Sequence, residues 1–188
     1  MNGQSDFDER SGVLLEAILF ATVKHRDQRR KDVFGSPYIN HPVRAAELLW
    51  RVGGIRDEVT LLAALLHDTV EDTATLPEEI EASFGPSVKD VVLEVTDDKS
   101  LPGARRKQLQ VERAGSLSMQ ARLVKLADKI ANLEDTIISP PCTWPRERIQ
   151  DYVLWTERVV AGLRGTNPKL EAEYDRVLSE AKAKYDLS

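Results

Sequence analysis

The residues best suited to chemistry follow an unbroken apolar run, Leu61–Leu66, in the first half of the chain. His67 and Asp68 come directly after this run, and two more carboxylates stand at Glu71 and Asp72. On a continuous helix, at about 100° per residue, these four side chains share one face within an arc of roughly 140°. Uncompensated charge on a buried helix is costly. A divalent metal ion bound there would compensate it.

Two more candidate ligands lie far from this segment in the sequence. His41 stands at the start of a predicted helix, where Pro42 restricts the backbone, and Asp128 lies among the apolar residues of a long predicted helix. Each has an ordinary alternative when taken alone: His41 as a capping or core histidine, Asp128 as the partner of a nearby base. Glu71 and Asp72 alone are typical of an exposed acidic helix end.

Two imidazoles and two carboxylates form a mixed nitrogen and oxygen ligand set. Such a set suits Mn, Fe, Zn or Co better than Ca or Mg. It leaves room for water and a phosphate oxygen, and the metal would activate the water and polarise the phosphoryl group. The candidate metal ligands are therefore His41, His67, Asp68 and Asp128.

Apolar residues recur at helical spacing along most of the chain, which predicts an all-α domain of about eight to ten helices. Loops are predicted at 34–37, 97–103 and 139–143, where Gly and Pro gather. No repeat or linker divides the chain, so we expect one domain over 1–188, with a core of about 12–167 and a C-terminal helix of about 168–184. The predicted helices are about 13–24, 42–52, 57–68, 75–84, 86–95, 105–108, 116–138, 145–163 and 168–184.

The composition of the 188 residues, 41% hydrophobic and 30% charged, is that of a soluble globular protein. A net charge of -5 argues against a nucleic-acid surface, although Lys24–Lys31 is basic and is either a solvated helix end or a phosphate-facing patch. The single Cys142 cannot form an internal disulfide, which suits a reducing cytoplasm. The polar segment Met1–Asp6 is not typical of a signal peptide, and no segment has the length of a membrane span.

The order His41, His67-Asp68, Asp128 resembles the H…HD…D pattern of HD-domain phosphohydrolases. Further motifs resemble the hydrolase domain of RelA/SpoT proteins, and most closely its stand-alone form, the small alarmone hydrolases of the metazoan SpoT-homologue type. The resemblance extends from roughly Leu15 to Asn167. Its motifs are Arg30-Lys31, Gly35–Pro42, Ala64–Asp72, Val95–Lys99 and Leu123–Lys129.

The resemblance implies an HD-domain helical bundle that hydrolyses the 3′-pyrophosphate of guanosine 3′-diphosphate 5′-di- or triphosphate (ppGpp or pppGpp). The products would be GDP or GTP plus pyrophosphate. One Mn²⁺ ion is the usual metal, and Glu71 and Asp72 would be the catalytic pair that orients water and handles protons. Two alternatives stay open: an HD phosphatase acting on another phosphorylated nucleotide such as NADPH, and a nucleotide sensor without turnover.

Substrate contacts are also implied by the resemblance. Arg30 and Lys31 match the family's basic pair near the guanine and phosphates, and Tyr38 is placed to pack against ribose or base. Asn132 lies four residues after Asp128, on the same helix face, and matches an Asn that contacts the nucleotide. Possible contacts to the 5′-phosphates, for which surface charge is the alternative, are Lys99, Arg105 and Lys107.

One position departs from the family pattern. Two residues after Asn132 these hydrolases often have Arg, whereas this chain has Glu134. A carboxylate near a polyanionic substrate would repel it, so either Glu134 points away from the site or the specificity differs. Asp135, which follows, does occur in stand-alone members.

Overall fold

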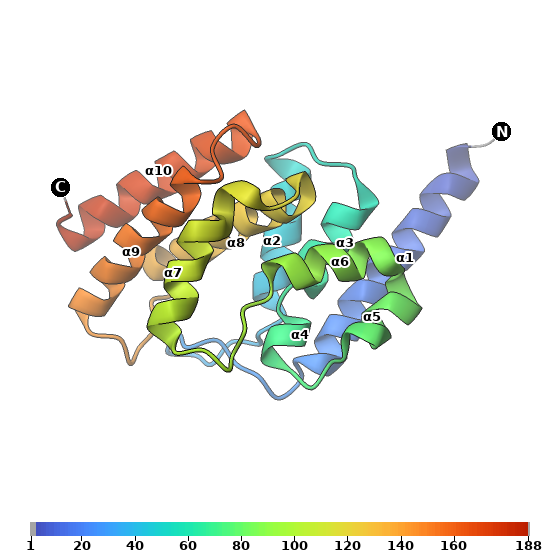
Figure 1. The fold of residues 1–188 in the computed structure, drawn as a ribbon, viewed down its shortest axis with the longest axis horizontal. Helices are drawn as coiled ribbons and strands as arrows, with labels where there is room; N and C mark the ends of the chain where they lie inside the picture. The colour runs from blue at the N-terminus through green and yellow to red at the C-terminus, as the bar shows by residue number, and fades with distance from the viewer. Residues whose placement is uncertain (1–2, 188) are drawn as a thin grey trace.

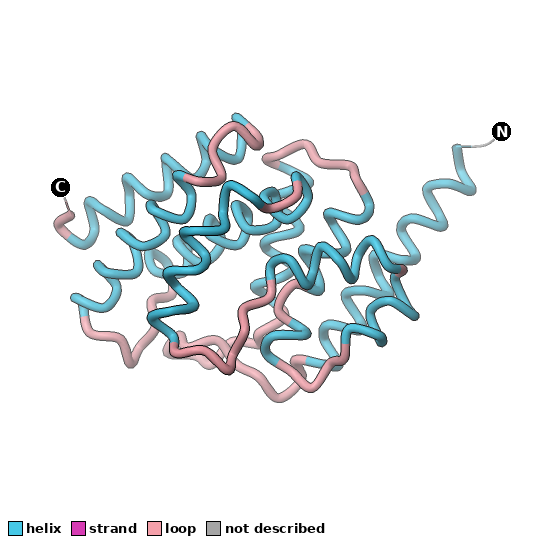
Figure 2. The backbone as a smooth tube through the Cα atoms, in the orientation of Figure 1, coloured by secondary structure: helices cyan, strands magenta, loops and turns pink. Residues whose placement is uncertain are grey.

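The computed structural model of the chain describes residues 3–187, and within this range it contains helices but no strand (Figure 2). The prediction of an all-α fold is confirmed. Met1 and Asn2, the first residues of the polar segment Met1–Asp6, lie outside the described residues. Among helices in residues 3–187, none is both long and apolar enough to cross a membrane. The elements are α1 (Gly3–Lys24), α2 (Asn40–Arg51), α3 (Glu58–Leu66), α4 (Thr69–Asp72), α5 (Pro77–Phe84), α6 (Pro86–Val95), α7 (Gly103–Arg113), the 3₁₀ turn η1 (Ala114–Ser116), α8 (Met119–Ile138), α9 (Arg146–Ala161) and α10 (Pro168–Tyr185).

Helix α8 forms the centre of the bundle and packs against α2, α3, α6, α9 and α10. Its apolar side chains point to several sides of the helix, so it is enclosed rather than lying on the surface. Figure 1 shows α9 and α10 side by side on one flank and α5 with α6 on the other. Burying a leucine or isoleucine side chain contributes roughly 1.5–3 kcal/mol. The fully buried α8 residues include Val124, Leu126, Ala127, Ile130 and Leu133.

The chain turns between α3 and α4, so the prediction that His67, Asp68, Glu71 and Asp72 share one helix face is wrong. The His67 ring nitrogen Nδ1 bonds to the carbonyl of Ala64 at 2.8 Å, and the backbone of Asp68 has φ −96° and ψ −5°. Side chains that bond to the last carbonyls of a helix compete with its continuation. The four polar side chains are therefore brought together by a turn at the end of a buried helix.

Loops from distant parts of the sequence gather along one edge of the molecule, the lower edge in Figure 2. Two backbone N–H groups hold these loops, one to another loop and one to helix α4. The backbone N–H of Cys142 donates to the carbonyl of Lys31 at 2.8 Å, and the backbone N–H of Asp97 donates to the Glu71 carboxylate at 2.9 Å. The loop between α1 and α2, which contains Arg30, Lys31 and Tyr38, runs along this edge (Figure 1).

Helix α1 begins at Gly3, earlier than the predicted start near Val13, whereas α10 begins where the sequence predicts. At α10 the Asn167 side chain accepts hydrogen bonds from the N–H groups of Lys169 and Leu170, both at 3.1 Å. Its amide nitrogen also donates to the carbonyl of Gly53, just after α2, at 3.0 Å. One side chain thus caps α10 and joins it to α2.

Replacing Asn167 with Ala should lower the free energy of unfolding by about 1–2 kcal/mol, because the cap and the bond to Gly53 are both lost. Asn167→Asp should lose less, since its carboxylate still accepts from the helix N–H groups. Urea denaturation followed by circular dichroism measures both. Equal stability of Asn167→Ala and the natural chain would contradict the assignment.

Candidate metal centre and adjoining cleft

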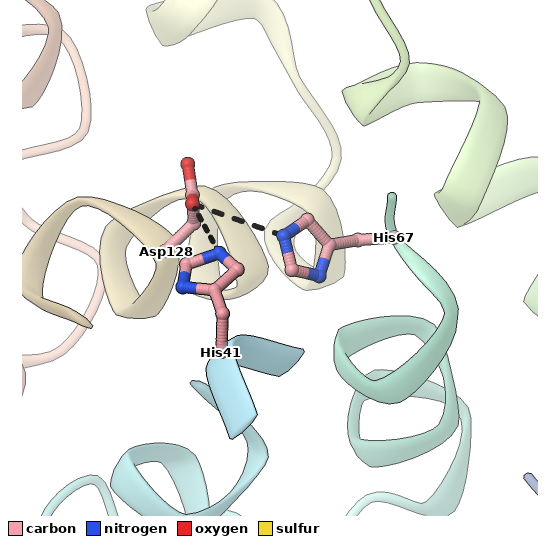
Figure 3. A group of neighbouring side chains, drawn as sticks. All are labelled: His41, His67 and Asp128. Carbon is pink, nitrogen blue, oxygen red and sulfur yellow. Dashed lines mark hydrogen bonds and ion pairs between the residues drawn. The ribbon is translucent and has the colours of Figure 1, made fainter. Parts of the chain in front are cut away.

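Four predicted ligands converge in the middle of the bundle (Figure 3 draws three of them). The Nε2 atom of His41 lies 3.1 Å from Oδ1 of Asp128 and 3.7 Å from Oδ2 of Asp68. The Nε2 atom of His67 lies 3.2 Å from Oδ2 of Asp68 and 3.8 Å from Oδ1 of Asp128. These side chains come from the start of α2, the turn after α3 and the middle of α8. His41, His67 and Asp128 are buried, and their ligand atoms all lie within 4.8 Å of one another.

The environment of His67 fits a metal ligand. Its Nδ1–H donates to the carbonyl of Ala64, which orients the ring and turns Nε2 toward the carboxylates. This Nε2 is buried and makes no hydrogen bond of ordinary geometry with the described residues. Once Nε2 has lost its proton, its lone pair faces two carboxylates and a second imidazole, an arrangement suited to a divalent cation of the Mn, Fe, Zn or Co type.

The charged groups of the cluster shift one another's pKa values. Burial lowers the pKa of His67, but Asp68 and Asp128 outweigh it and raise this pKa to about 10. Burial raises the pKa of Asp68, but His67 outweighs it and holds this pKa below its usual range. Burial likewise raises the pKa of Asp128, but Lys129, with Nζ 2.9 Å from Oδ2, and the histidines hold it well below its usual range. A proton on His67 thus balances the carboxylates in the metal-free protein, and a cation would replace it.

The two predicted catalytic carboxylates, Glu71 and Asp72, face different neighbours. Glu71 accepts the backbone N–H of Asp97, and Nη1 of Arg106 lies 3.6 Å from its Oε1. Burial raises the pKa of Glu71. Asp72 accepts a hydrogen bond from Gln28 in the loop between α1 and α2, at 3.2 Å, and pairs with the exposed Lys99 in the loop between α6 and α7. The turn before α4 therefore directs one carboxylate toward α7 and the other toward a cleft.

This cleft, of about 370 Å³, is lined by Asp72 together with the four predicted substrate-binding residues. In it, Nη2 of Arg30 donates to Oδ1 of Asn132 at 3.2 Å and pairs with Asp135. The Arg30 guanidinium lies 5.5 Å from the centre of the Tyr38 ring. The predicted residues brought together here are Arg30, Lys31, Tyr38 and Asn132.

Two aromatic residues of the cleft were missed by the sequence analysis. Trp144 and Tyr152 both line it, with ring centroids 5.6 Å apart, and the Lys31 ammonium lies 5.8 Å from the Trp144 ring. Aromatic residues near the start of a predicted helix are equally typical of core positions, so sequence alone did not single them out. Their flat faces, flanked by a cation, are suited to a nucleobase.

The three possible phosphate contacts differ in position. Lys99 pairs with Asp72, which lines the cleft. Lys107 lies over the Tyr152 and Trp155 rings and lines an adjoining hollow of about 540 Å³. Arg105 instead pairs with Glu112 on the surface at 3.1 Å, as the alternative of simple surface charge predicts.

Glu134 points away from the cleft. Its carboxylate accepts two hydrogen bonds from the Arg44 guanidinium on α2, at 2.9 and 2.6 Å, and its side chain is only 13% exposed. This paired arrangement neutralises the carboxylate. The departure from the family pattern therefore places no free negative charge beside the candidate substrate site.

A comparison with protein families matches residues 17–152 to the HD domain. The chain belongs to the HD-domain family. HD domains bind a divalent metal ion, and His41, His67 and Asp128 lie close enough together to hold one. The relatives include guanosine-3′,5′-bis(diphosphate) 3′-pyrophosphohydrolase MESH1 from Xenopus tropicalis, which is 52% identical over 170 residues, 90% of this chain and 95% of the relative.

Two further comparisons agree with this placement among HD-domain proteins. The protein of the same name from Homo sapiens is 56% identical over 158 residues, 84% of this chain and 88% of that protein. A solved structure described as "A metazoan ortholog of SpoT hydrolyzes ppGpp and plays a role in starvation responses" has a TM-score of 0.87 at 46% sequence identity. The match covers 89% of this chain and 94% of that one.

Metal affinity should rise with pH. Because His67 has a pKa of about 10 in the metal-free protein, it must lose a proton before its Nε2 can bind a cation. The association constant for Mn²⁺ should therefore increase about tenfold per pH unit between about pH 6.5 and 8.5. Calorimetric titrations in buffers of different ionisation enthalpy measure both the affinity and the proton released. A pH-independent affinity would show that His67 is already neutral.

Proposed function

We propose that this chain is a metal-dependent hydrolase that removes the 3′-pyrophosphate of guanosine 3′,5′-bis(diphosphate) and of its 5′-triphosphate form, a reaction that cleaves a diphosphoric monoester. The observation that supports this most is the likeness to MESH1 relatives over nearly their whole length, at about half identity. The products are GDP or GTP plus pyrophosphate. The proposal treats residues 1–188 as one domain and places the reaction in the cytoplasm, which the unpaired Cys142 supports.

The proposed metal is a single Mn²⁺ ion held by the two histidines and two aspartates of the cluster. The mixed nitrogen and oxygen donors support this assignment, and Zn²⁺, Fe²⁺ and Co²⁺ suit the same set. When bound, such an ion supplies Lewis-acid activation of water and of a phosphoryl oxygen. The proposed ligands are His41, His67, Asp68 and Asp128.

Glu71 and Asp72 are the proposed catalytic residues, which orient the attacking water and transfer protons, including one to the departing 3′ oxygen. The raised pKa of Glu71 supports this role, because a carboxylate that protonates more readily is a better proton carrier near neutral pH. The position of Asp72, between the cluster and the cleft, supports a role close to the leaving group.

The cleft is the proposed site for the rest of the nucleotide. Arg30 and Tyr38 provide a guanidinium and an aromatic face for the base, with Trp144 and Tyr152 as further stacking surfaces. Lys31 supplies positive charge for the phosphates, and Asn132 supplies an amide within reach of both the cluster and the cleft. This arrangement directs the 3′-diphosphate toward the metal cluster.

Purified protein with Mn²⁺, incubated separately with ppGpp, pppGpp and NADPH, tests the proposal. We expect release of pyrophosphate from the guanosine nucleotides to be fastest. Fastest turnover of NADPH would replace this function with a phosphatase acting on that nucleotide. Tight binding of ppGpp without release of pyrophosphate would instead indicate a sensor.

Two substitutions separate metal binding from proton transfer. Asp128→Ala should lose both bound metal and activity, because it removes a ligand. Glu71→Gln should keep the metal and lower kcat by about 10²- to 10⁴-fold, the usual contribution of a general acid or base. Metal analysis and steady-state kinetics of the two variants distinguish these results. If Asp128→Ala hydrolysed ppGpp as fast as the natural protein, Asp128 would not be a metal ligand.

Position 134 should be neutral for substrate binding. Glu134→Ala should leave KM for ppGpp unchanged and lower the free energy of unfolding by about 1–3 kcal/mol, because it removes a largely buried carboxylate that accepts two hydrogen bonds from a guanidinium. Arg30→Ala is the contrasting variant: it removes a guanidinium from the cleft and should raise KM about 10- to 100-fold. A comparable change of KM in both variants would place Glu134 at the substrate.

A further inference from the structure

The third histidine, His25, is buried near the cleft and has no place in the metal cluster. It lies just after α1 and is only 2% exposed. Its ring stacks on the Tyr38 ring, with centroids 4.9 Å apart and planes inclined by 29°. Its Nε2 atom is buried and has no hydrogen-bond partner among the described residues. The remaining ring nitrogen, Nδ1, makes the one side-chain hydrogen bond of this ring within residues 3–187.

That contact begins a chain of hydrogen bonds. Nδ1 of His25 lies 2.7 Å from Oε1 of Gln28, and Nε2 of Gln28 lies 3.2 Å from Oδ2 of Asp72. A carboxylate oxygen that carries no proton only accepts hydrogen bonds, so the Gln28 amide turns its NH₂ group toward Oδ2 of Asp72. Its oxygen then faces His25, and Nδ1 of His25 must carry the proton. The direction of every donor in this chain is thereby determined.

Tyr38 reaches the same carboxylate oxygen from a second side. Its hydroxyl lies 3.2 Å from Oδ2 of Asp72 and 2.7 Å from Oδ2 of Asp68. Both groups that contact Oδ2 of Asp72 therefore contact His25, one through a hydrogen bond and the other through ring stacking. Among the described residues, the other oxygen, Oδ1, contacts only the half-exposed Lys99.

From this geometry we infer that His25 and Gln28 are positioning residues, which hold Oδ2 of Asp72 so that Oδ1 is presented to the reacting nucleotide. The inference rests on the proposed function, in which Asp72 is catalytic. The last torsion of an aspartate side chain is broad, so an unsupported carboxylate samples many orientations. A displacement of about 1 Å in a catalytic group can cost about 10²-fold in rate.

Gln28→Leu removes the donor while keeping a similar volume. We expect kcat to fall about 10- to 100-fold, with KM within about twofold and the bound metal unchanged. Asp72→Asn supplies the second arm of a double-mutant cycle. Because Gln28 acts through Asp72, adding Gln28→Leu to Asp72→Asn should cause no further loss. Losses that multiply in the double variant, or full kcat in folded Gln28→Leu, would overturn the inference.

His25 offers a matched pair of variants. Asparagine can place an N–H close to the position of Nδ1, whereas leucine cannot, so His25→Asn should keep more of kcat than His25→Leu at equal thermal stability. Equal kcat in the two folded variants would overturn the role of His25.

A spectroscopic measurement tests the hydrogen-bond chain from His25 to Asp72 without any substrate. Long-range ¹⁵N–¹H correlation spectra of the natural protein should show a proton on Nδ1 of His25. Finding Nδ1 without a proton would overturn the hydrogen-bond chain even in an active enzyme. If the protein hydrolyses none of the tested nucleotides while Nδ1 carries the proton, the proposed function fails and the positioning geometry stands.

Discussion

The structure depends on one electrostatic constraint: two carboxylates and two imidazoles share a space from which water is largely excluded. Buried ions are tolerated only where their charges are balanced and their remaining atoms are hydrogen-bonded. Here Lys129 holds the outer oxygen of Asp128, and the carbonyl of Ala64 holds the outer nitrogen of His67. The apolar helices α3 and α8 carry these groups into the core, so helix packing and the charge balance of the cluster depend on each other.

The metal cluster and the cleft are built on different kinds of backbone structure. The cluster is built on helices and on the turn directly after one, which hold their side chains closely. The cleft is built largely from the loop that contains Arg30 and Lys31 and from the segment before α9 that contains Trp144. The bond from Cys142 to Lys31 joins these two segments. Sites on loops adapt to ligands more readily than sites on helices. We therefore expect differences in nucleotide preference among related proteins to arise in the cleft.

Asp72 lies where the metal cluster and the cleft meet. Its contacts with Gln28, Tyr38 and Lys99 belong to the cleft, while its neighbour in the chain, Glu71, belongs to the opposite side. One short helix, α4, thus directs adjacent carboxylates to two different environments. Such a division is useful for a reaction in which one group handles the attacking water and another the leaving oxygen.

The sequence by itself determined the helical class and most helix positions, because apolar periodicity is a local signal. The convergence of His41, His67, Asp68 and Asp128 was predicted from the resemblance to the HD motif, since His41 and Asp128 are 87 residues apart. The sequence could not determine the direction of Glu71 and Asp72, since the turn at Asp68 arises from side-chain bonds to helix carbonyls that periodicity does not record. The pairing of Glu134 with Arg44, 90 residues away, and the places of Tyr152 and His25 were likewise decided only by tertiary structure. Contacts between residues distant in the chain depend on how helices pack, and each such side chain has several equally plausible environments until the packing is known.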